Sequence, residues 1–397
     1  MSKWSYVALG EICEITGGNS APQGSEPFEG GTLPFVRMRD LGRYHFTSNL
    51  DETDDKLTED AVQKYRMKIF EPGCILFPRS GSVFLNHRAI LGIRASIVSH
   101  IGVLHKFSDL INVKFLYYYL QTYDMTRLSK KTTGVDSIAF SDVVKIKVPL
   151  PPLPEQERIV SLLDEAESLR VARERANVRM EQIIPALFHE MFGYAFAGQA
   201  KDTPLVRLDS ICTKITDGTH VTPKYLDHGV PFLSVKNITK KLGSLDFSDV
   251  KYISREEHEK ISRLSNVERD DLLYTKVGAT YGYAQIVDTD KEFSIFVSVA
   301  LLKPDKAKII PKYLEGVMNT DFIKNQADRR IKGIGVPDLH LKEIRSFIIP
   351  LPPLNLQQKF AERVKEAREI QSAQGRSTER VEALYQSMLD RAFKGEL

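Results

Sequence analysis

Cysteine, tryptophan and long apolar runs are all scarce in this sequence. Three cysteines and one tryptophan occur among 397 residues, and three cysteines are too few for the disulfide framework of a small secreted protein. No stretch approaches the roughly 18 uninterrupted apolar residues that a membrane-spanning helix needs. The N-terminus, Met1-Ser2-Lys3-Trp4-Ser5, has no apolar signal core. We therefore expect a protein of the reducing cytoplasm, with no membrane partner.

Motifs of common catalytic centres are also absent. The sequence contains no P-loop, no His-Glu-x-x-His, no paired Cys-x-x-Cys and no Gly-x-Ser-x-Gly elbow. The two Pro-Pro pairs, at 151–152 and 352–353, are each followed by leucine, so the Asn/Asp-Pro-Pro-Tyr/Phe tetrad of amino-methylating enzymes is missing. These absences predict a chain without a catalytic centre, a metal site or a bound cofactor. Cys13 and Cys212 lie in apolar runs, and we interpret both as core residues.

What is present is a globular composition with little net charge. Hydrophobic residues make up 42% and charged residues 27% of the chain, and the net charge is +3. Lys and Arg outnumber Asp and Glu by 18 to 16 in residues 1–150 and by 24 to 21 in residues 199–350, but residues 151–198 carry 5 against 8. Nucleic-acid binding by the two larger blocks is permitted by this balance, not demonstrated by it.

The chain repeats itself with a period near 200 residues. Val7-Ala8-Leu9-Gly10-Glu11-Ile12-Cys13 returns as Val206-Arg207-Leu208-Asp209-Ser210-Ile211-Cys212. The clearest echo is Val148-Pro149-Leu150-Pro151-Pro152-Leu153, which returns as Ile349-Pro350-Leu351-Pro352-Pro353-Leu354, with Gln156 matching Gln357. So long a period indicates a duplicated domain that is followed each time by the same kind of tail.

The expected fold is α+β, with two similar mixed α/β domains separated by two long antiparallel coiled-coil helices in a pseudo-two-fold repeat. Residues 1–150 form the first domain, 151–198 the central connecting helix, 199–350 the second domain and 351–397 the C-terminal helix. Short apolar runs at 97–104 and 296–302 predict strands, in mainly antiparallel sheets. Residues 113–123 and 311–318 predict helices.

Apolar residues recur at spacings of three and four after each Pro-rich hexad, which is typical of a coiled coil. We expect a coiled-coil or partner interface at these positions: Ile159, Leu162, Leu169, Met180, Ile183 and Leu187 in the first helix, and Phe360, Val364, Val381 and Met388 in the second. Pro185 predicts a kink or restart in the first helix. Gly375 weakens the centre of the second by about 1 kcal/mol relative to alanine.

Several loops pair basic side chains with Gly, Ser or Thr, a composition that favours contact with phosphates and base edges. The candidate DNA-binding residues are Arg37, Arg39, Arg43, Arg79, Ser80, Lys130, Lys131 and Thr133 in the first block, and Thr219, His220, Lys224, Lys236, Lys276, Tyr281, Arg329, Arg330 and Lys332 in the second. Matching positions, such as Arg79 with Lys276, favour this interpretation modestly. The alternative is that these loops are merely solvated.

The whole pattern resembles the specificity subunit of type I restriction–modification systems. The resemblance rests on Pro149 to Val160 (PLPPLPEQERIV), on Gly73-Cys74-Ile75-Leu76 before Arg79-Ser80-Gly81, and on Thr133-Gly134-Val135 ahead of the hexad. Two segments match the family's sequence motifs less closely, namely Asn355-Leu356-Gln357-Gln358 and Gly333-Ile334-Gly335-Val336.

The resemblance implies two target-recognition domains, each reading one half of a split site on double-stranded DNA. It implies helices that hold the domains apart and bind two methyltransferase subunits, which use S-adenosylmethionine to methylate adenine at N6. Restriction subunits that translocate DNA with ATP and magnesium would join the complex. The chain itself would hold none of these cofactors.

Two other functions are weighed against this one. A coiled-coil adaptor whose domains bind proteins would explain the same helices, and salt-dependent binding to duplex DNA distinguishes the two. A fused restriction–methylation enzyme would need a methyltransferase domain, for which the repeat leaves no room.

Overall fold

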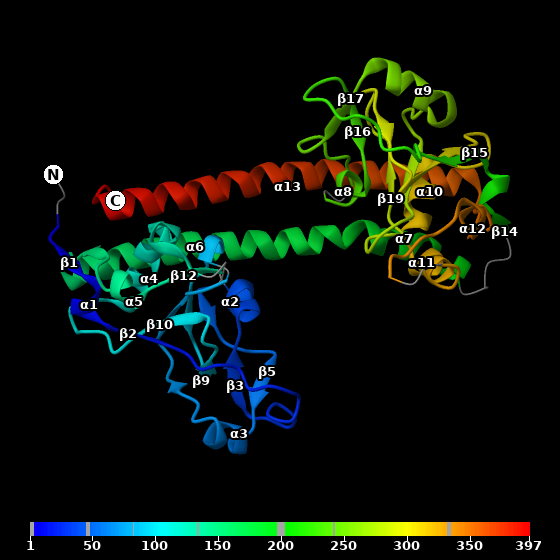
Figure 1. The fold of residues 1–397 in the computed structure, drawn as a ribbon. Coiled ribbons are helices and arrows are strands. Elements are labelled where there is room, and N and C mark those ends of the chain that lie inside the picture. Colours follow the sequence, from blue (N-terminus) through cyan, green and yellow to red (C-terminus); the bar gives the residue numbers. More distant parts are fainter. Residues whose placement is uncertain are drawn as a thin grey trace. The chain divides into compact units, whose positions relative to one another are not determined.

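The chain divides into two compact units, shown in Figure 1. The computed structural model describes residues 4–44, 48–81, 83–132, 135–196, 203–240, 243–331 and 335–397. Unit 1 comprises residues 1–176 and 376–397, and unit 2 comprises residues 177–375. Each unit therefore holds one block of the repeat together with a stretch of both long helices.

Unit 1 is built on two mainly antiparallel sheets. The central sheet has strand order β2-β10-β7-β8-β4, and the second has order β5-β3-β9-β6. Two parallel pairs, β3 with β9 and β4 with β8, lie among antiparallel ones. The strands of these sheets are β2 (Glu14–Gly17), β3 (Leu33–Val36), β4 (Asn49–Leu50), β5 (Asp55–Leu57), β6 (Ile69–Phe70), β7 (Ile75–Pro78), β8 (Ala89–Leu91), β9 (Ala95–Ile97) and β10 (Ile101–His105).

Unit 2 repeats this plan with fewer strands. Its central sheet has order β15-β21-β18-β19 and its second sheet has order β17-β16-β20. Antiparallel ladders β1–β13 and β11–β12 in unit 1, and β14–β22 in unit 2, complete the units. The remaining strands are β1 (Tyr6–Ala8), β11 (Ser129–Thr132), β12 (Val135–Ile138), β13 (Lys147–Pro149), β14 (Leu205–Arg207), β15 (Cys212–Asp217), β16 (Val230–Leu233), β17 (Lys251–Ile253), β18 (Leu272–Thr275), β19 (Ala284–Ile286), β20 (Ser294–Ile295), β21 (Val299–Pro304) and β22 (Ile348–Pro350).

Short helices cover the sheets, and long ones follow each block. The short helices are α1 (Leu9–Ile12), α2 (Met38–Tyr44), α3 (Glu59–Lys64), α4 (Val113–Thr122), α5 (Phe140–Val143), α8 (Val235–Thr239), α9 (Arg255–Ser265), α10 (Pro311–Met318), α11 (Asp321–Asp328) and α12 (Leu341–Arg345). The long ones are α6 (Leu153–Glu181), α7 (Ile183–Phe196) and α13 (Leu354–Lys394). The α+β class, the internal repeat and the helices at 113–123 and 311–318 are thus confirmed.

The two apolar runs that predicted single strands both contain a turn. The first is divided between β9 and β10, whereas the second begins just after β20, turns at Val297 and Ser298 and continues into β21. The strands on the two sides of each turn belong to different sheets. The apolar periodicity is the same on both sides of the intervening turn, so the sequence pattern alone did not reveal the turn.

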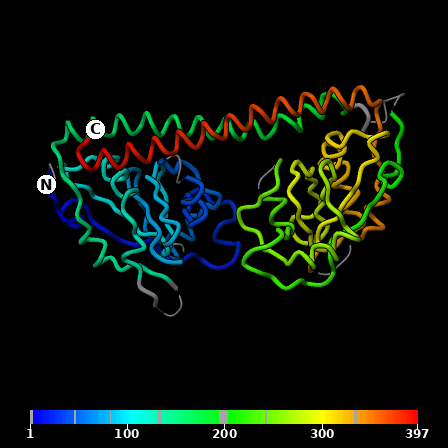
Figure 2. The backbone as a smooth tube through the Cα atoms, turned by 90° about the horizontal axis from the view of Figure 1, so that it is seen from above, coloured from blue at the N-terminus to red at the C-terminus, as the bar shows by residue number. Residues whose placement is uncertain are grey.

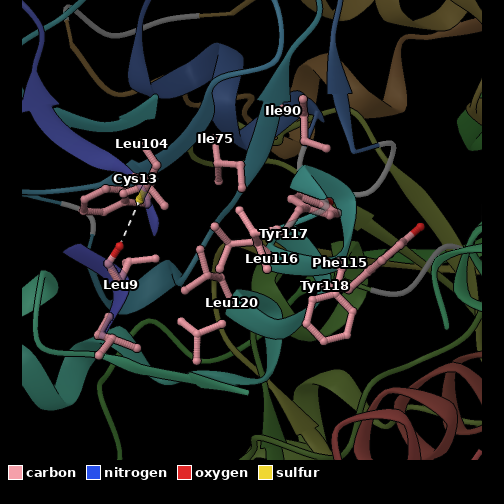
Figure 3. Packing of buried hydrophobic residues seen from close by; sticks show 14 of the residues in the cluster. Leu9, Cys13, Ile75, Ile90, Leu104, Phe115, Leu116, Tyr117, Tyr118 and Leu120 are labelled. Carbon is pink, nitrogen blue, oxygen red and sulfur yellow. Dashed lines mark hydrogen bonds between the residues drawn. The ribbon is translucent and has the colours of Figure 1, made fainter. Parts of the chain in front are cut away.

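Figure 3 shows the core of unit 1, where α4 packs on the central sheet. Phe115, Leu116 and Tyr118 of α4 are fully buried with Ile75. Cys13 is buried in the same cluster, and its Sγ donates to the Leu9 carbonyl at 3.4 Å. Burial raises the pKa of the Cys13 thiol to about 12, as expected of a core residue rather than a reactive one.

Within each unit the long helices run antiparallel. In unit 1, the Arg158 guanidinium reaches the carbonyl of Leu397 at 2.7 Å and Arg170 pairs with Glu382 at 2.8 Å. Figure 2 shows the C-terminal end of α13, in red, beside the start of α6. In unit 2, Gln371 donates to the Met180 carbonyl at 2.9 Å. The expected antiparallel arrangement is confirmed inside both units.

The buried face of the helices differs from the predicted seam. In α6 the buried residues include Ile159, Leu163 and Ala166, whereas Leu162 is half-buried and Leu169 is 45% exposed. The buried positions belong to the hydrophobic core of unit 1, which includes the domain. The helix therefore turns part of its apolar stripe toward the domain, and the coiled-coil or partner interface at Leu162 and Leu169 stays a prediction.

The other predicted interface residues fall into three groups. Phe360 and Val364 are buried in the core of unit 2, and Leu187 and Met388 pack against the cores of units 2 and 1, respectively. Met180 and Val381 are half-buried, and Ile183 is 40% exposed. The predicted break near Pro185 is confirmed, because α6 ends at Glu181 and α7 begins at Ile183.

The matched glutamines of the two hexads tie each long helix to its domain. The Gln156 amide donates to the carbonyls of Leu110 and Pro151 at 2.9 and 2.8 Å and accepts from the Asn112 amide at 2.8 Å. Gln357 repeats the arrangement with Pro352 at 2.7 Å and Ile310 at 2.9 Å. Gln156 and Gln357 are both fully buried. The Gln156 side chain therefore joins the Pro-rich turn to the start of α4, and the Gln357 side chain does the same for α10. We call each of these hydrogen-bonded side chains a clamp.

A change of side-chain size distinguishes the two cores. The position of Tyr118 in α4 corresponds to Gly316 in α10. The long helices differ as well, because α7 contributes Phe188 to the core of unit 2 at the position where α13 contributes Leu389 to the core of unit 1. A Cβ on Gly316 would lie 2.8 Å from the Phe188 ring and 3.0 Å from the Phe360 ring. The glycine thus makes room for two aromatic rings that unit 1 lacks at these positions.

Gly316→Ala is expected to lower the free energy of unfolding of unit 2 by about 1–3 kcal/mol, the usual cost of overpacking a filled core. Adding Phe188→Leu should restore part of the loss. Gly375→Ala is the matched control, since nothing lies within 4 Å of a Cβ at that helical position, and it should stabilise by up to about 1 kcal/mol. Thermal unfolding of the full chain measures all three, and equal effects at the two glycines would refute the steric explanation.

Candidate nucleic-acid interface

Two candidate residues of unit 1, Arg79 and Ser80, lie at one edge of its central sheet. β2 and β7 both run antiparallel to β10, so the ends of β2 and β7 and the start of β10 share this edge. Beyond it, the Arg79 amide donates to the His100 carbonyl at 2.8 Å, and Ser80 Oγ lies 2.7 Å from His100 Nδ1. We call Arg79, Ser80 and His100 the sheet-edge cluster.

The β11–β12 hairpin is attached to this cluster. The Ile138 amide donates to the Arg79 carbonyl at 2.9 Å, and the Gly81 amide donates to the Asp136 carbonyl at 3.1 Å. The strand β11 carries Lys130 and Lys131. Their side chains, like Thr133 as a whole, lie outside the described residues. The hairpin nevertheless brings β11, whose sequence is basic, next to Arg79 at the end of β7.

Arg79 is held in place by a ring and not by an acid. Its guanidinium carbon lies 4.5 Å from the centroid of Phe140, and no ion pair joins it to a carboxylate among the described residues. A cation packed on a ring keeps its position while its N–H donors remain available. Such an arginine suits bidentate contact with a phosphate or with guanine.

Sequence reasoning missed one further cation at this edge. Lys68 Nζ donates to Thr16 Oγ1 at 3.1 Å and to the Gly17 carbonyl at 3.2 Å. The alternating run Lys64, Arg66, Lys68 was visible in the sequence. Its nearness to Arg79 depends on β2 and β7 flanking β10, and no local pattern indicates that pairing.

A second basic group of unit 1 is neutralised by its own acids. Arg39 pairs with Asp54 at 3.2 Å and with Asp55 at 2.9 Å, and Arg37 pairs with Asp55. Arg43 binds both oxygens of Asp54, at 2.9 and 2.8 Å; these hydrogen bonds lower the pKa of the Asp54 carboxyl. These three arginines can bind phosphate only by giving up their ion pairs with Asp54 and Asp55.

The equivalent edge of unit 2 is built differently. Lys276 corresponds to Arg79 but is only 5% exposed, and its ammonium lies 3.4 Å from Asp217 and 3.8 Å from Asp338. In this conformation it serves as a buried ion-pair partner and presents little surface to DNA.

The other candidates of unit 2 are more accessible but partly engaged. His220 lies 3.2 Å from Asp217, Thr219 bonds within its own turn to Val221, and Lys224 is exposed. Lys236 pairs with Asp249 at 2.9 Å.

Tyr281 lies in the loop between β18 and β19 and contacts α11. Its hydroxyl donates to Asp328 at 2.6 Å, and Lys324 Nζ lies 3.3 Å from the centre of its ring. Arg329 follows directly as the C-cap of α11, and Arg330 Nη1 donates to the Gln326 carbonyl at 2.9 Å. Lys332 lies outside the described residues. The structure thus gathers Tyr281 and the two arginines at one end of one helix.

The described part of the chain shows no candidate metal site and no candidate membrane span. No group of three or more His, Cys, Asp or Glu side chains there is placed to hold a metal ion. None of the described helices combines the length and the apolar character needed to cross a membrane.

The sequence model of the type I restriction modification DNA specificity domain matches this chain twice, over residues 1–177 and 201–382. The chain belongs to this family. The two matches coincide with the two copies of the internal repeat, so each copy is one DNA specificity domain. The function of this family is the recognition of target sites on DNA.

Curated relatives and solved structures agree with this assignment. The MjaIX specificity subunit of Methanocaldococcus jannaschii is 22% identical over 384 residues, covering 90% of this chain and 85% of that protein. The EcoKI specificity subunit of Escherichia coli is 24% identical over 398 residues, covering 92% and 82%.

Solved structures show the same fold. A chain from a structure of a type I R-M system matches with TM-score 0.60 and 18% identity, covering 99% of this chain and 98% of that one. The S subunit from M. genitalium matches with TM-score 0.51 and 14% identity, covering 99% and 96%.

Proposed function

We propose that this chain is the DNA-reading subunit of a type I restriction–modification complex, with no catalytic centre and no bound cofactor of its own. Each domain reads one half of a split, asymmetric target. Two methyltransferase subunits, which use S-adenosylmethionine to methylate adenine at N6, are directed to that target. Restriction subunits that need ATP and magnesium join them, and the complex works in the cytoplasm. Family membership and the names of the relatives support this proposal.

The observation that carries the proposal is the contrast between the two sheet edges. Equivalent strand ends present Arg79 on a ring in unit 1, but in unit 2 a Lys276 buried between two aspartates. Since different donors at the base edges select different bases, two unlike edges favour two unlike half-sites. We expect half-sites of about three to five base pairs whose centres lie about one helical turn, roughly 34–36 Å, apart.

Sequencing the methylome of cells that carry this chain with its partner subunits tests the proposal. The expected result is one bipartite, non-palindromic motif with methylated adenines, absent from cells that carry the partners alone. Replacing residues 1–150 with the equivalent block of a relative should change one half-site and leave the other unaltered. A continuous or palindromic motif would contradict the split target.

An adaptor whose domains bind only proteins is the alternative. The ion-paired state of Arg37, Arg39 and Arg43 favours it locally. Titrating the purified chain with duplex DNA at several salt concentrations decides between the two, because neutralised phosphates release counterions and make the affinity fall steeply with salt. An adaptor shows no such dependence.

A further inference from the structure

The turn that follows Arg79 exposes two large apolar side chains. Phe84 and Leu85 lie in the short 3₁₀ helix Val83–Leu85 and are 67 and 44% exposed, whereas Val83 is buried. Phenylalanine is among the residues most often found inside a protein, yet here the smaller valine takes the buried place. The phenylalanine ring is therefore presented to solvent five residues after Arg79.

The turn that carries this ring is fixed by hydrogen bonds. Asn86 follows the 3₁₀ helix with a φ of +51°, a left-handed conformation that asparagine adopts more readily than most residues. Its side chain accepts from the Met125 amide at 3.2 Å and donates to the Tyr123 carbonyl at 3.3 Å. Its Oδ1 also accepts from Nη2 of the fully buried Arg88 at 2.8 Å. The exposed ring thus projects from a turn that is tied to the interior of unit 1.

The ring lies beside the β11–β12 hairpin. Phe84 lines a hollow of about 230 Å³ together with Thr126, Ser129 of β11 and Asp136 of β12. The same hairpin is hydrogen-bonded to the backbone of Arg79, as described above. Phe84 and Arg79 therefore both lie next to β12, and the ring borders the sheet-edge cluster.

Unit 2 places an aromatic residue at the equivalent position but holds it down. Gly81 and Gly278 both have positive φ, of +80° and +94°, and the amide of each donates to the chain segment that returns beside it, at 3.1 and 3.0 Å. Three residues after these glycines stand Phe84 and Tyr281. Tyr281 packs against the core of unit 2, and its hydroxyl donates to Asp328 at 2.6 Å. The two copies thus share the turn and differ in whether the ring stands in solvent.

We propose that Phe84 is a wedge that inserts between two base pairs of the DNA bound by unit 1 and kinks the duplex there. Phenylalanine is one of the apolar side chains that proteins insert into base steps, and its contact with the bases offsets the cost of unstacking them. The neighbouring Arg79 and the basic sequence of β11 favour DNA as the occupant, because cations beside the ring fit the phosphates that flank an opened step. Since Tyr281 is held against its own unit, the kink is confined to one half-site. This inference rests on the proposed function, which makes duplex DNA the ligand of unit 1.

The test is the shape of the bound DNA. The full chain is co-expressed with its methyltransferase subunits and bound to a duplex that carries the motif obtained from the methylome. Energy transfer between fluorophores at the two duplex ends reports the bend. Wild type is expected to kink the duplex by about 20–90°, the usual range for an inserted wedge. Phe84→Ala should straighten it by at least about 20° and weaken binding roughly 5- to 150-fold, the equivalent of one lost base–aromatic stack. Phe84→Trp, which keeps a ring, should retain the kink.

The position of the wedge is read with 2-aminopurine, which fluoresces more strongly where base stacking is lost. Placed along the duplex, it should brighten with wild type but not with Phe84→Ala at one step, in the half-site that replacement of residues 1–150 changes. Leu110→Ala is the matched control. Leu110 is 60% exposed in the same unit but follows the end of β10 opposite the sheet-edge cluster, so its removal should leave bend and affinity unchanged.

Unchanged circular dichroism shows that the variants are folded, and native mass spectrometry shows which subunits each one retains. A Phe84→Ala complex that bends the duplex as wild type does would overturn the wedge alone. Loss of a protein subunit from that complex would also overturn it, by making Phe84 a contact with protein. If the wild-type complex binds this duplex no more tightly than an unrelated one, the proposed function fails, and the wedge with it.

Discussion

Replacing Gln156 by leucine is expected to lower the free energy of unfolding of unit 1 by about 3–6 kcal/mol. The substitution leaves the buried Pro151 carbonyl, the Leu110 carbonyl and the half-buried Asn112 amide without their partner. A buried polar group that loses its partner costs about 1–3 kcal/mol. Because the clamp joins α6 to α4, docking of the helix to its domain should weaken with it. Chemical denaturation of the full chain measures the loss.

Gln357→Leu repeats the experiment in unit 2, where two groups lose their partner, the Pro352 carbonyl and the Ile310 amide. Its expected effect is smaller, about 2–4 kcal/mol. Gln358→Leu is the control, since Gln358 is exposed and donates only to Glu362 at 3.2 Å, and it should change stability by no more than about 0.5 kcal/mol. If Gln156→Leu matches this control, the clamp contributes nothing.

The glutamines show what the sequence could predict and what it could not. Their matched position after each hexad was visible, and so were the repeat, the helices and the break near Pro185. Their role was not visible, because each also binds a residue about 46 residues away along the chain, as Gln156 binds Leu110. Long-range hydrogen bonds leave no trace in local periodicity.

The helix register shows a second limit. Apolar spacing of three and four predicts an apolar stripe, but the stripe of α6 is wide enough to include both Leu162 and Leu163. Only Leu163 is fully buried. Which of two adjacent apolar residues faces inward depends on the surface that the domain presents. That surface is formed by strands and helices distant in sequence, so the spacing alone did not show that Leu163, and not Leu162, faces the core.

The sheet-edge residues show a third limit. Arg79 and Lys276 occupy equivalent places in the repeat, and both were predicted to meet DNA. Their surroundings differ through residues far along the chain: Phe140 lies near Arg79, whereas Asp217 and Asp338 flank Lys276. Residue type and position predict a cation at each edge. Whether that cation is exposed or buried in an ion pair depends on tertiary contacts.

This contrast predicts that alanine at Arg79 mainly weakens DNA binding, whereas alanine at Lys276 mainly lowers the stability of unit 2. Arg79→Ala should weaken binding to target DNA by about 1–3 kcal/mol and reduce the salt dependence by about one counterion. The stability of unit 1 should fall by less than about 1 kcal/mol, since only the contact with Phe140 is lost. Lys276→Ala should lower the free energy of unfolding of unit 2 by about 3–5 kcal/mol, because Asp217, nearly buried, loses its cation.

Fluorescence anisotropy with target DNA and chemical denaturation of the same samples separate the two outcomes. Adding Asp217→Asn to Lys276→Ala removes the uncompensated charge and should recover part of the lost stability, whereas Arg79→Ala has no such rescue. A Lys276→Ala chain that keeps its stability but loses DNA affinity would place Lys276 at the DNA. In that case the buried ion pair of this structure would have to open on binding, and the two edges would read DNA with the same kind of residue after all.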